Sequence, residues 1–170
     1  IMRPNVNIDQ LMTRVDEAFA ALRSQDVTIL TITGLNVQGQ GPFAGTRGRT
    51  AIYNELLRGI AEDHGAHIID YWRWNDFIDW RLWADDRLHM NEYGHERFAS
   101  RTLAQLGLPG IVPERALPPE VQLSARERVE QEARWVREFA LPWVGRRLKG
   151  TSSGDNLSPK YPTWVPAAGV

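Results

Sequence analysis

The chain has 170 residues, no cysteine, and 20 basic against 21 acidic side chains, for a formal net charge of -1. This length suits one domain. The absence of cysteine excludes a disulfide scaffold, a thiolate nucleophile and a cysteine-ligated zinc site. A balanced charge lacks the basic excess of nucleic-acid binders, and no apolar run approaches the ~20 residues of a membrane span. We therefore expect no nucleic-acid partner and no membrane span. The absence of cysteine leaves the compartment open, because it is compatible with either redox state. A cytoplasmic location is the default expectation.

The first half of the chain alternates helix and strand patterns. Residues 8–24 have apolar side chains at three- and four-residue steps, which predicts an amphipathic helix with Asn7 as its N-cap. Residues 27–33 (VTILTIT) predict a strand buried on both faces. A second helix is predicted over 50–64, ended by Gly65, and a second strand over 66–72. This order indicates an α/β fold with a parallel sheet.

A long glycine-rich loop, residues 34–49, follows the first predicted strand. In open α/β sheets, ligands bind beyond the carboxyl ends of strands. The loop lacks the Gly-x-Gly-x-x-Gly pattern of a dinucleotide site, and a pocket rim and a plain connector remain equally good interpretations.

The second half begins with a tryptophan-rich loop or short helix over residues 74–87, followed by a predicted helix over 91–106 with Asn91 as N-cap. We expect residues 1–108 to form the core, 109–123 a proline-rich connector, 124–149 a charged helix interrupted at Pro142, and 150–170 an irregular tail. The apolar side chains of the last helix, Trp135, Val136, Phe139 and Trp143, are expected to dock on the domain, and its end is basic.

The clearest candidate for chemistry is Asp86-Arg87-Leu88-His89, just before the helix that opens at Asn91. An aspartate three residues before a histidine on a turn can bring its carboxylate to the imidazole Nδ1. That contact fixes the tautomer and leaves Nε2 as a general base for a nucleophile. Asp85 could compete for this role, but the spacing of Asp86 is better. The alternative is a helix-capping aspartate beside a surface histidine.

Two other groups of residues have weaker functional interpretations. Trp80 and Trp83 could line an apolar acyl pocket beside His89, or could simply pack a loop onto the sheet edge. His95, with Glu92, Asp86 and His89, can be drawn as a metal site, but the spacing matches no zinc pattern and His89 cannot easily serve as both ligand and base. We therefore expect no metal ion at this position.

The segment DRLHMNEYGHERFA resembles the C-terminal block of the SGNH (GDSL-type) serine hydrolases, in which an Asp-x-x-His pair precedes the last core helix. IMRPNV is similar to the segment after that family's Gly-x-Asn-Asp block, and RGRTAIYNELLRGIAEDHGAHIIDYW to its penultimate helix and last core strand. RLWADDRLHMNEYGHERFA and LPWVGRRLKGTSSGDNLSPKYP resemble an actinobacterial subgroup. The resemblance implies a flavodoxin-like three-layer α/β/α sandwich. It also implies hydrolysis of a small-molecule, lipid or carbohydrate ester without a cofactor, with His89 as base and Asp86 as its orienting acid.

The chain departs from this family in what it lacks. None of its serines (Ser24, Ser100, Ser124, Ser152, Ser153 and Ser158) lies in a Gly-Asp-Ser setting, and the blocks that supply oxyanion donors are absent. Two strands cannot build a sheet covered on both faces. We therefore expect the nucleophile, the oxyanion donors and the N-terminal strands to lie upstream in the same protein, and this chain alone to be inactive. The rival hypothesis is a non-catalytic interaction module in which Asp86 and His89 are a helix-capping pair.

Overall fold

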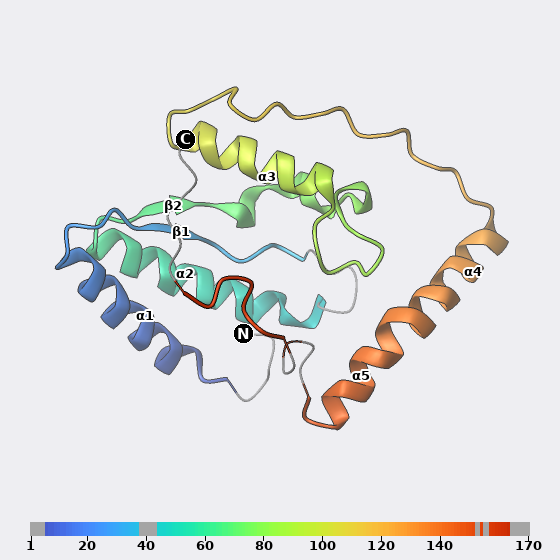
Figure 1. Ribbon diagram of the computed structural model, residues 1–170, viewed down its shortest axis with the longest axis horizontal. Helices are drawn as coiled ribbons and strands as arrows, with labels where there is room; N and C mark the ends of the chain where they lie inside the picture. Colours follow the sequence, from blue (N-terminus) through green and yellow to red (C-terminus); the bar gives the residue numbers. More distant parts are fainter. Residues whose placement is uncertain (1–5, 38–43, 152–153, 155–156, 164–170) are drawn as a thin grey trace. The chain divides into compact units, whose positions relative to one another are not determined.

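A computed structural model describes residues 6–37, 44–151, 154 and 157–163. The chain divides into two compact units, Ile1–Pro118 and Pro119–Val170, which are described separately. The first unit holds α1 (Ile8–Arg23), β1 (Leu30–Ile32), α2 (Arg47–Asp63), β2 (His67–Ile69) and α3 (Glu92–Gln105), with short helical turns between β2 and α3. In Figure 1 the strand pair runs between α2 and α3.

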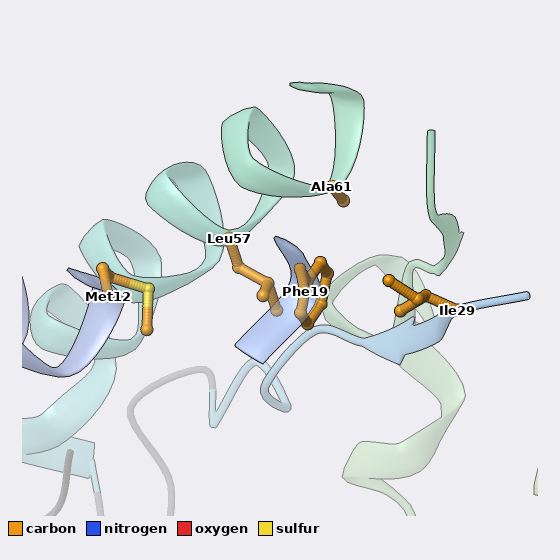
Figure 2. Packing of buried hydrophobic residues seen from close by; sticks show 5 residues of the cluster. All are labelled: Met12, Phe19, Ile29, Leu57 and Ala61. Atoms are coloured by element: carbon orange, nitrogen blue, oxygen red, sulfur yellow. The ribbon is translucent and has the colours of Figure 1, made fainter. Parts of the chain in front are cut away.

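The first hydrophobic core joins α1 and α2 to the sheet. Asn7 caps α1 as predicted, since its side-chain oxygen accepts a hydrogen bond from the Gln10 N–H at 3.1 Å. Helical periodicity then places apolar side chains of α1 against those of α2 and the segment entering β1. The buried members are Met12, Phe19, Ile29, Leu57 and Ala61, which Figure 2 shows converging from these elements.

The sheet of the described chain consists of β1 and β2, which pair in parallel with Leu30 opposite His67 and Ile32 opposite Ile69. The predicted strands were in the right places but too long, because only these short segments find a ladder partner. The expectation that residues 27–33 are buried on both faces was wrong. Ile29 and Thr33 are buried on the helix-covered face, whereas Leu30 and Ile32, on the other face, are each 42% exposed. An α/β architecture with a small parallel sheet is consistent with a partial SGNH fold.

Two polar side chains, Asn54 and Thr33, fix the chain where β1 ends. The buried Asn54 of α2 donates its amide to the Gly34 carbonyl at 3.0 Å and accepts from the Gly34 N–H at 2.7 Å. Thr33 Oγ1 donates to Asp70 at 3.1 Å and accepts the Trp72 N–H at 2.9 Å. These bonds satisfy backbone groups that the short ladder leaves unpaired and hold both strand ends at one edge of the sheet. Residues 38–43 of the glycine-rich loop lie outside the described residues, so its two interpretations stay open.

The second core lies under the tryptophan-rich segment. Within residues 74–87, predicted as a loop or short helix, the chain forms two short 3₁₀ turns, η3 (Asn75–Ile78) and η4 (Trp80–Leu82). A third turn, η2 (Tyr71–Arg73), lies just before them, where the second strand was predicted to end. Tyr71, Phe77 and Leu82 are buried, and Trp83, Met90 and Phe98 pack against them. This core holds the segment before α3, which carries Asp86 and His89, on the rest of the unit.

The second unit contains one run of helix, α4 (Ala125–Trp135), a π-helical turn η5 (Val136–Ala140) and α5 (Leu141–Leu148), drawn in orange in Figure 1. Ser124 and Glu127 form a reciprocal capping box at its start. The helix was predicted to be interrupted at Pro142, but the irregular turn, η5, lies just before this proline. A proline inside a helix cannot donate a hydrogen bond to the carbonyl four residues earlier, and its ring clashes with that carbonyl. The extra residue of the π turn accommodates both effects. Helix runs on to Leu148.

Candidate active site

Asp86 and His89 are in contact. His89 Nδ1 lies 2.6 Å from Asp86 Oδ2. An ionised carboxylate only accepts hydrogen bonds, so Nδ1 carries the proton in this contact and Nε2 keeps its lone pair when the imidazole is neutral. The His89 side chain is 74% exposed. The geometry therefore presents an oriented basic nitrogen at the surface of the described residues.

The backbone turn holds this carboxylate under the imidazole. The other carboxylate oxygen, Asp86 Oδ1, accepts the N–H groups of Leu88 at 2.9 Å and His89 at 3.0 Å. Arg87, between them, has a φ of +57°, in the left-handed region that side-chain-bearing residues rarely adopt. Such strain persists where the surroundings over-determine the conformation and is common at functional sites. Asp85, which was the alternative partner for His89, is exposed, and the adjacent Asp86 makes the contact with the imidazole.

Asn91 and Gly94 brace the turn, and sequence reasoning recognised only part of their role. Asn91 caps α3 as predicted, accepting the Gly94 N–H at 3.1 Å, but its amide also donates to the carbonyls of Arg81 at 2.8 Å and Trp83 at 3.1 Å. A Cβ on Gly94 would lie 2.2 Å from the Leu82 carbonyl oxygen. The chain before and after the Asp86–His89 turn is thus tied to the start of α3. The sequence signal for this close packing is an Asn followed three residues later by a Gly.

The environment keeps Asp86 in its charged form. Partial burial raises the pKa of this carboxyl, but the hydrogen bonds from the His89 and Leu88 N–H groups and from the imidazole outweigh that effect, so the pKa lies below its ordinary value. A carboxylate that stays ionised can stabilise an imidazolium on His89 without taking its proton.

A model of the GDSL-like lipase/acylhydrolase family matches residues 2–97. The match covers more than half of the chain and includes Asp86 and His89. The chain belongs to the GDSL-like lipase/acylhydrolase family. Searches of curated proteins and of solved structures returned no match. Membership of this family suggests ester hydrolysis, and hence an ester substrate.

Trp80 and Trp83, the two tryptophans predicted to contact the substrate, have different surroundings. Trp83 donates its ring N–H to the Phe77 carbonyl at 2.8 Å and packs on the second core. Trp80 is 45% exposed, and the Arg87 guanidinium lies 5.5 Å from its ring centre. Trp83 therefore has a structural explanation, whereas Trp80 lies at the surface beside a residue of the Asp86–His89 turn.

Within the described part of the first unit, the His89 side chain contacts Asp86 and no serine. Ser24 donates to the Ala21 carbonyl at the end of α1, Ser100 lies within α3 and Ser124 caps α4. Ser158 follows the last helix, and Ser152 and Ser153 lie outside the described residues. Each described serine before Ser158 therefore lies within or at the end of a helix, and none of them follows β1 or β2.

The remaining histidines have other surroundings. His64 Nε2 lies 2.6 Å from Asp16 Oδ1, a contact that joins the end of α2 to α1 and that a helix C-terminus favours. His95 is exposed on α3. Glu92, drawn above as a partner in a metal site, instead pairs with Arg115 at 3.1 Å. Within the described ranges there is no cluster of three or more His, Asp and Glu side chains that could hold a metal ion, and no helix long and apolar enough to cross a membrane.

Proposed function

We propose that this chain supplies the general base and its orienting carboxylate to a serine ester hydrolase. The observation that carries the proposal is the 2.6 Å contact between His89 Nδ1 and Asp86 Oδ2, on a side chain whose other nitrogen is open to a reacting group. Family membership, which suggests ester hydrolysis, supports this reaction class; the route through an acyl-enzyme is part of the proposal.

In this mechanism His89 Nε2 removes the proton of a serine hydroxyl as its oxygen attacks the ester carbonyl carbon. The resulting imidazolium returns the proton to the departing alcohol, leaving the acyl group on the serine. His89 then removes a proton from water as the water oxygen attacks the acyl-enzyme, and the imidazolium returns that proton to the serine oxygen as the acid is released. Asp86 keeps Nδ1 protonated and stabilises the imidazolium at each step. General acid–base catalysis of this kind contributes about 10²–10⁴-fold.

The serine and the oxyanion donors are proposed to come from polypeptide that precedes this chain in the same protein. Two observations support this arrangement. The serines within and at the ends of α1, α3 and α4 are held by helix geometry, and the apolar side chains Leu30 and Ile32 on the outer face of β1 are left for further polypeptide to cover. The three-layer SGNH sandwich and the lipid, carbohydrate or small-molecule nature of the ester belong to the same proposal.

The rival hypothesis treats Asp86 and His89 as a helix-capping pair in a non-catalytic module. Asn91 is the residue whose side chain caps α3, through the Gly94 N–H. The start of that helix therefore does not require Asp86 or His89, and this favours the catalytic interpretation.

The test uses the longer protein that includes the preceding polypeptide, and a fluorophosphonate probe that reacts with activated serines. We expect labelling on an upstream serine and turnover of a chromogenic ester, with both reduced about 10²–10⁴-fold in His89→Ala. His95→Ala, which removes an exposed histidine further along α3, is the matched control and should leave both unchanged. The 170-residue chain alone should neither label nor turn over ester. Labelling of this chain by itself, or full activity of His89→Ala, would overturn the proposal.

Trp80 is proposed as the substrate-contacting tryptophan, because its ring is exposed beside Arg87 whereas Trp83 is anchored in the second core. In the longer protein, Trp80→Ala should shift the preference among esters of different acyl length while the melting temperature holds. Trp83→Ala should lower the melting temperature through lost packing. If Trp80→Ala leaves acyl preference unchanged, Trp80 is a surface residue without this role.

A further inference from the structure

The chain that follows α3 turns back and packs along that helix, and Figure 1 shows this segment in yellow. Glu114 carboxylate oxygens lie 3.3 Å from Arg97 Nε and 3.6 Å from Arg101 Nε, two arginines of α3. The same arginines pair with Asp76 of η3, at 3.2 Å and 2.6 Å between guanidinium nitrogen and carboxylate oxygen. These charges join η3, α3 and the segment that follows α3. We call residues 114–118 the strap.

Arg115, the second residue of the strap, holds the start of α3. Its Nη2 lies 3.1 Å from a carboxylate oxygen of Glu92, and its Nε lies 2.7 Å from one of Glu96 on the next turn. Its guanidinium carbon also lies 4.7 Å from the centre of the Tyr93 ring. A single surface ion pair contributes little, but a planar guanidinium shared by two carboxylates and a ring has a defined position. Since Glu92 is the third residue after His89, these contacts hold the chain just beyond the base.

The last residues of the strap hold the chain that leads into the same turn. Leu117 packs on the second core, of which the buried Leu82 is a member. The Pro118 carbonyl accepts a hydrogen bond from Arg81 Nη1 at 2.9 Å. The backbone carbonyl of Arg81 in turn accepts the side-chain amide of Asn91 at 2.8 Å. The strap is thus bonded to the segment before the turn as well as to the helix after it.

The contacts of the strap therefore fall on both sides of the Asp86–His89 turn, at Arg81 before it and at Glu92 after it. A side chain on a turn keeps a fixed direction only when the elements on either side are themselves held in place. We propose that the strap positions His89, with Arg115 as a positioning residue that fixes the start of α3. This inference rests on the proposed function, because the direction of the imidazole matters to the reaction only if His89 is the base.

Steady-state kinetics of Arg115→Gln in the longer protein test the inference. We expect kcat for a chromogenic ester to fall about tenfold with KM unchanged, because a misplaced base slows the chemical step and a displacement of ~1 Å costs up to about 10²-fold. Glu96→Gln should lower kcat in the same direction, and the double variant should be no slower than Arg115→Gln, since both changes remove one contact. Arg115→Lys, which keeps the charge, should recover part of the rate. Arg126→Gln, which removes the exposed ion pair with Glu130 in α4, is the matched control and should leave kcat unchanged.

A second measurement needs no activity, so failure of the inference and failure of the proposed function are distinguishable. The N–H groups of Leu88 and His89 donate to Asp86, and their exchange with solvent reports how firmly the turn is held. By NMR of the longer protein, both amides should exchange several-fold faster in Arg115→Gln, while those of α2 keep their rates.

Unchanged exchange with unchanged kcat would overturn the inference, and so would a raised KM, which would make Arg115 a substrate contact. A lower melting temperature without a change in kcat or exchange would leave Arg115 a purely structural role and would overturn it too. Faster exchange of the two amides together with full activity of His89→Ala would support the hold of the strap on the turn and overturn only the proposed function.

Discussion

At the scale of single residues, Asp86 uses both of its oxygens. One accepts two backbone N–H groups of its own turn, and the other meets the imidazole of His89. The Asp-x-x-His spacing predicted the second contact, since a turn of that length can return a carboxylate to the third residue. It could not predict the left-handed conformation of Arg87, because arginine, unlike glycine, asparagine or aspartate, has no preference for a positive φ. That conformation depends on contacts made by the rest of the loop.

A pH titration tests the two contacts of Asp86. The carboxyl pKa lies below its ordinary value of 3.8, so the stabilisation that these hydrogen bonds provide is fully present above pH 3.8 and is lost as the pH falls through the lowered pKa. Carbon NMR of the side-chain carboxyl should give a midpoint below 3.8 for Asp86. In His89→Ala the midpoint should rise only part of the way back, since the backbone N–H groups remain. Asp85→Asn, which alters the adjacent exposed carboxylate, should leave the Asp86 titration in place. A midpoint at or above 3.8 would contradict the geometry.

At the scale of elements, the candidate site belongs to a loop–helix unit closed by backbone bonds. The Ala84 N–H donates to the His89 carbonyl at 2.8 Å, and the Asn91 N–H to the Leu82 carbonyl at 3.1 Å. Trp83 and Met90 form an antiparallel bridge between these bonds. The positions of Asp86 and His89 therefore depend on how closely the start of α3 approaches Leu82, and that approach needs a residue without a side chain at Gly94.

Gly94→Ala tests this dependence. The new Cβ would lie 2.2 Å from the Leu82 oxygen, so the loop must shift, at a cost of about 1–3 kcal/mol. In the longer protein we expect ester turnover to fall by up to about 10²-fold, since misplacing a catalytic group by ~1 Å has that effect. Gly59→Ala, at an exposed position inside α2 with no atom within 4 Å of the new Cβ, is the control. It should raise the free energy of unfolding by about 0.5–1 kcal/mol and leave turnover unchanged. Equal behaviour of the two variants would show that Gly94 has no special role.

Helices were more predictable than strands here, for a physical reason. Apolar periodicity and local caps such as Asn7, Asn91 and Ser124 depend on the segment itself, and α1 and α3 match their predicted ranges to within a residue at each end. The ends of a strand depend on a partner elsewhere in the chain, and β1 pairs only over Leu30–Ile32. The π turn before Pro142 could not be predicted from the sequence either. A proline indicates where a helix is perturbed, but not which geometry the preceding turn adopts.

At the scale of the whole molecule, the described sheet leaves apolar surface uncovered. Leu30 and Ile32 are each 42% exposed on the face of β1 away from α1 and α2. Full burial of a leucine or isoleucine contributes about 1.5–3 kcal/mol, and net domain stabilities are only about 5–15 kcal/mol. Two such side chains left partly in water therefore remove a significant share of the stability of the first unit. The sequence had already indicated this, because two predicted strands are too few for a sheet covered on both faces.

We therefore predict that the first unit is weakly stable in the 170-residue chain and is stabilised by the preceding polypeptide. Thermal unfolding of that chain should be broad, and the amides of β1 should exchange with deuterium rapidly. In the proposed longer protein the transition should be sharp and the β1 amides protected, because the preceding polypeptide then pairs with the sheet edge and covers Leu30 and Ile32. A sharp cooperative transition of the shorter chain, with β1 protected to the same degree, would show that the first unit needs no further strands.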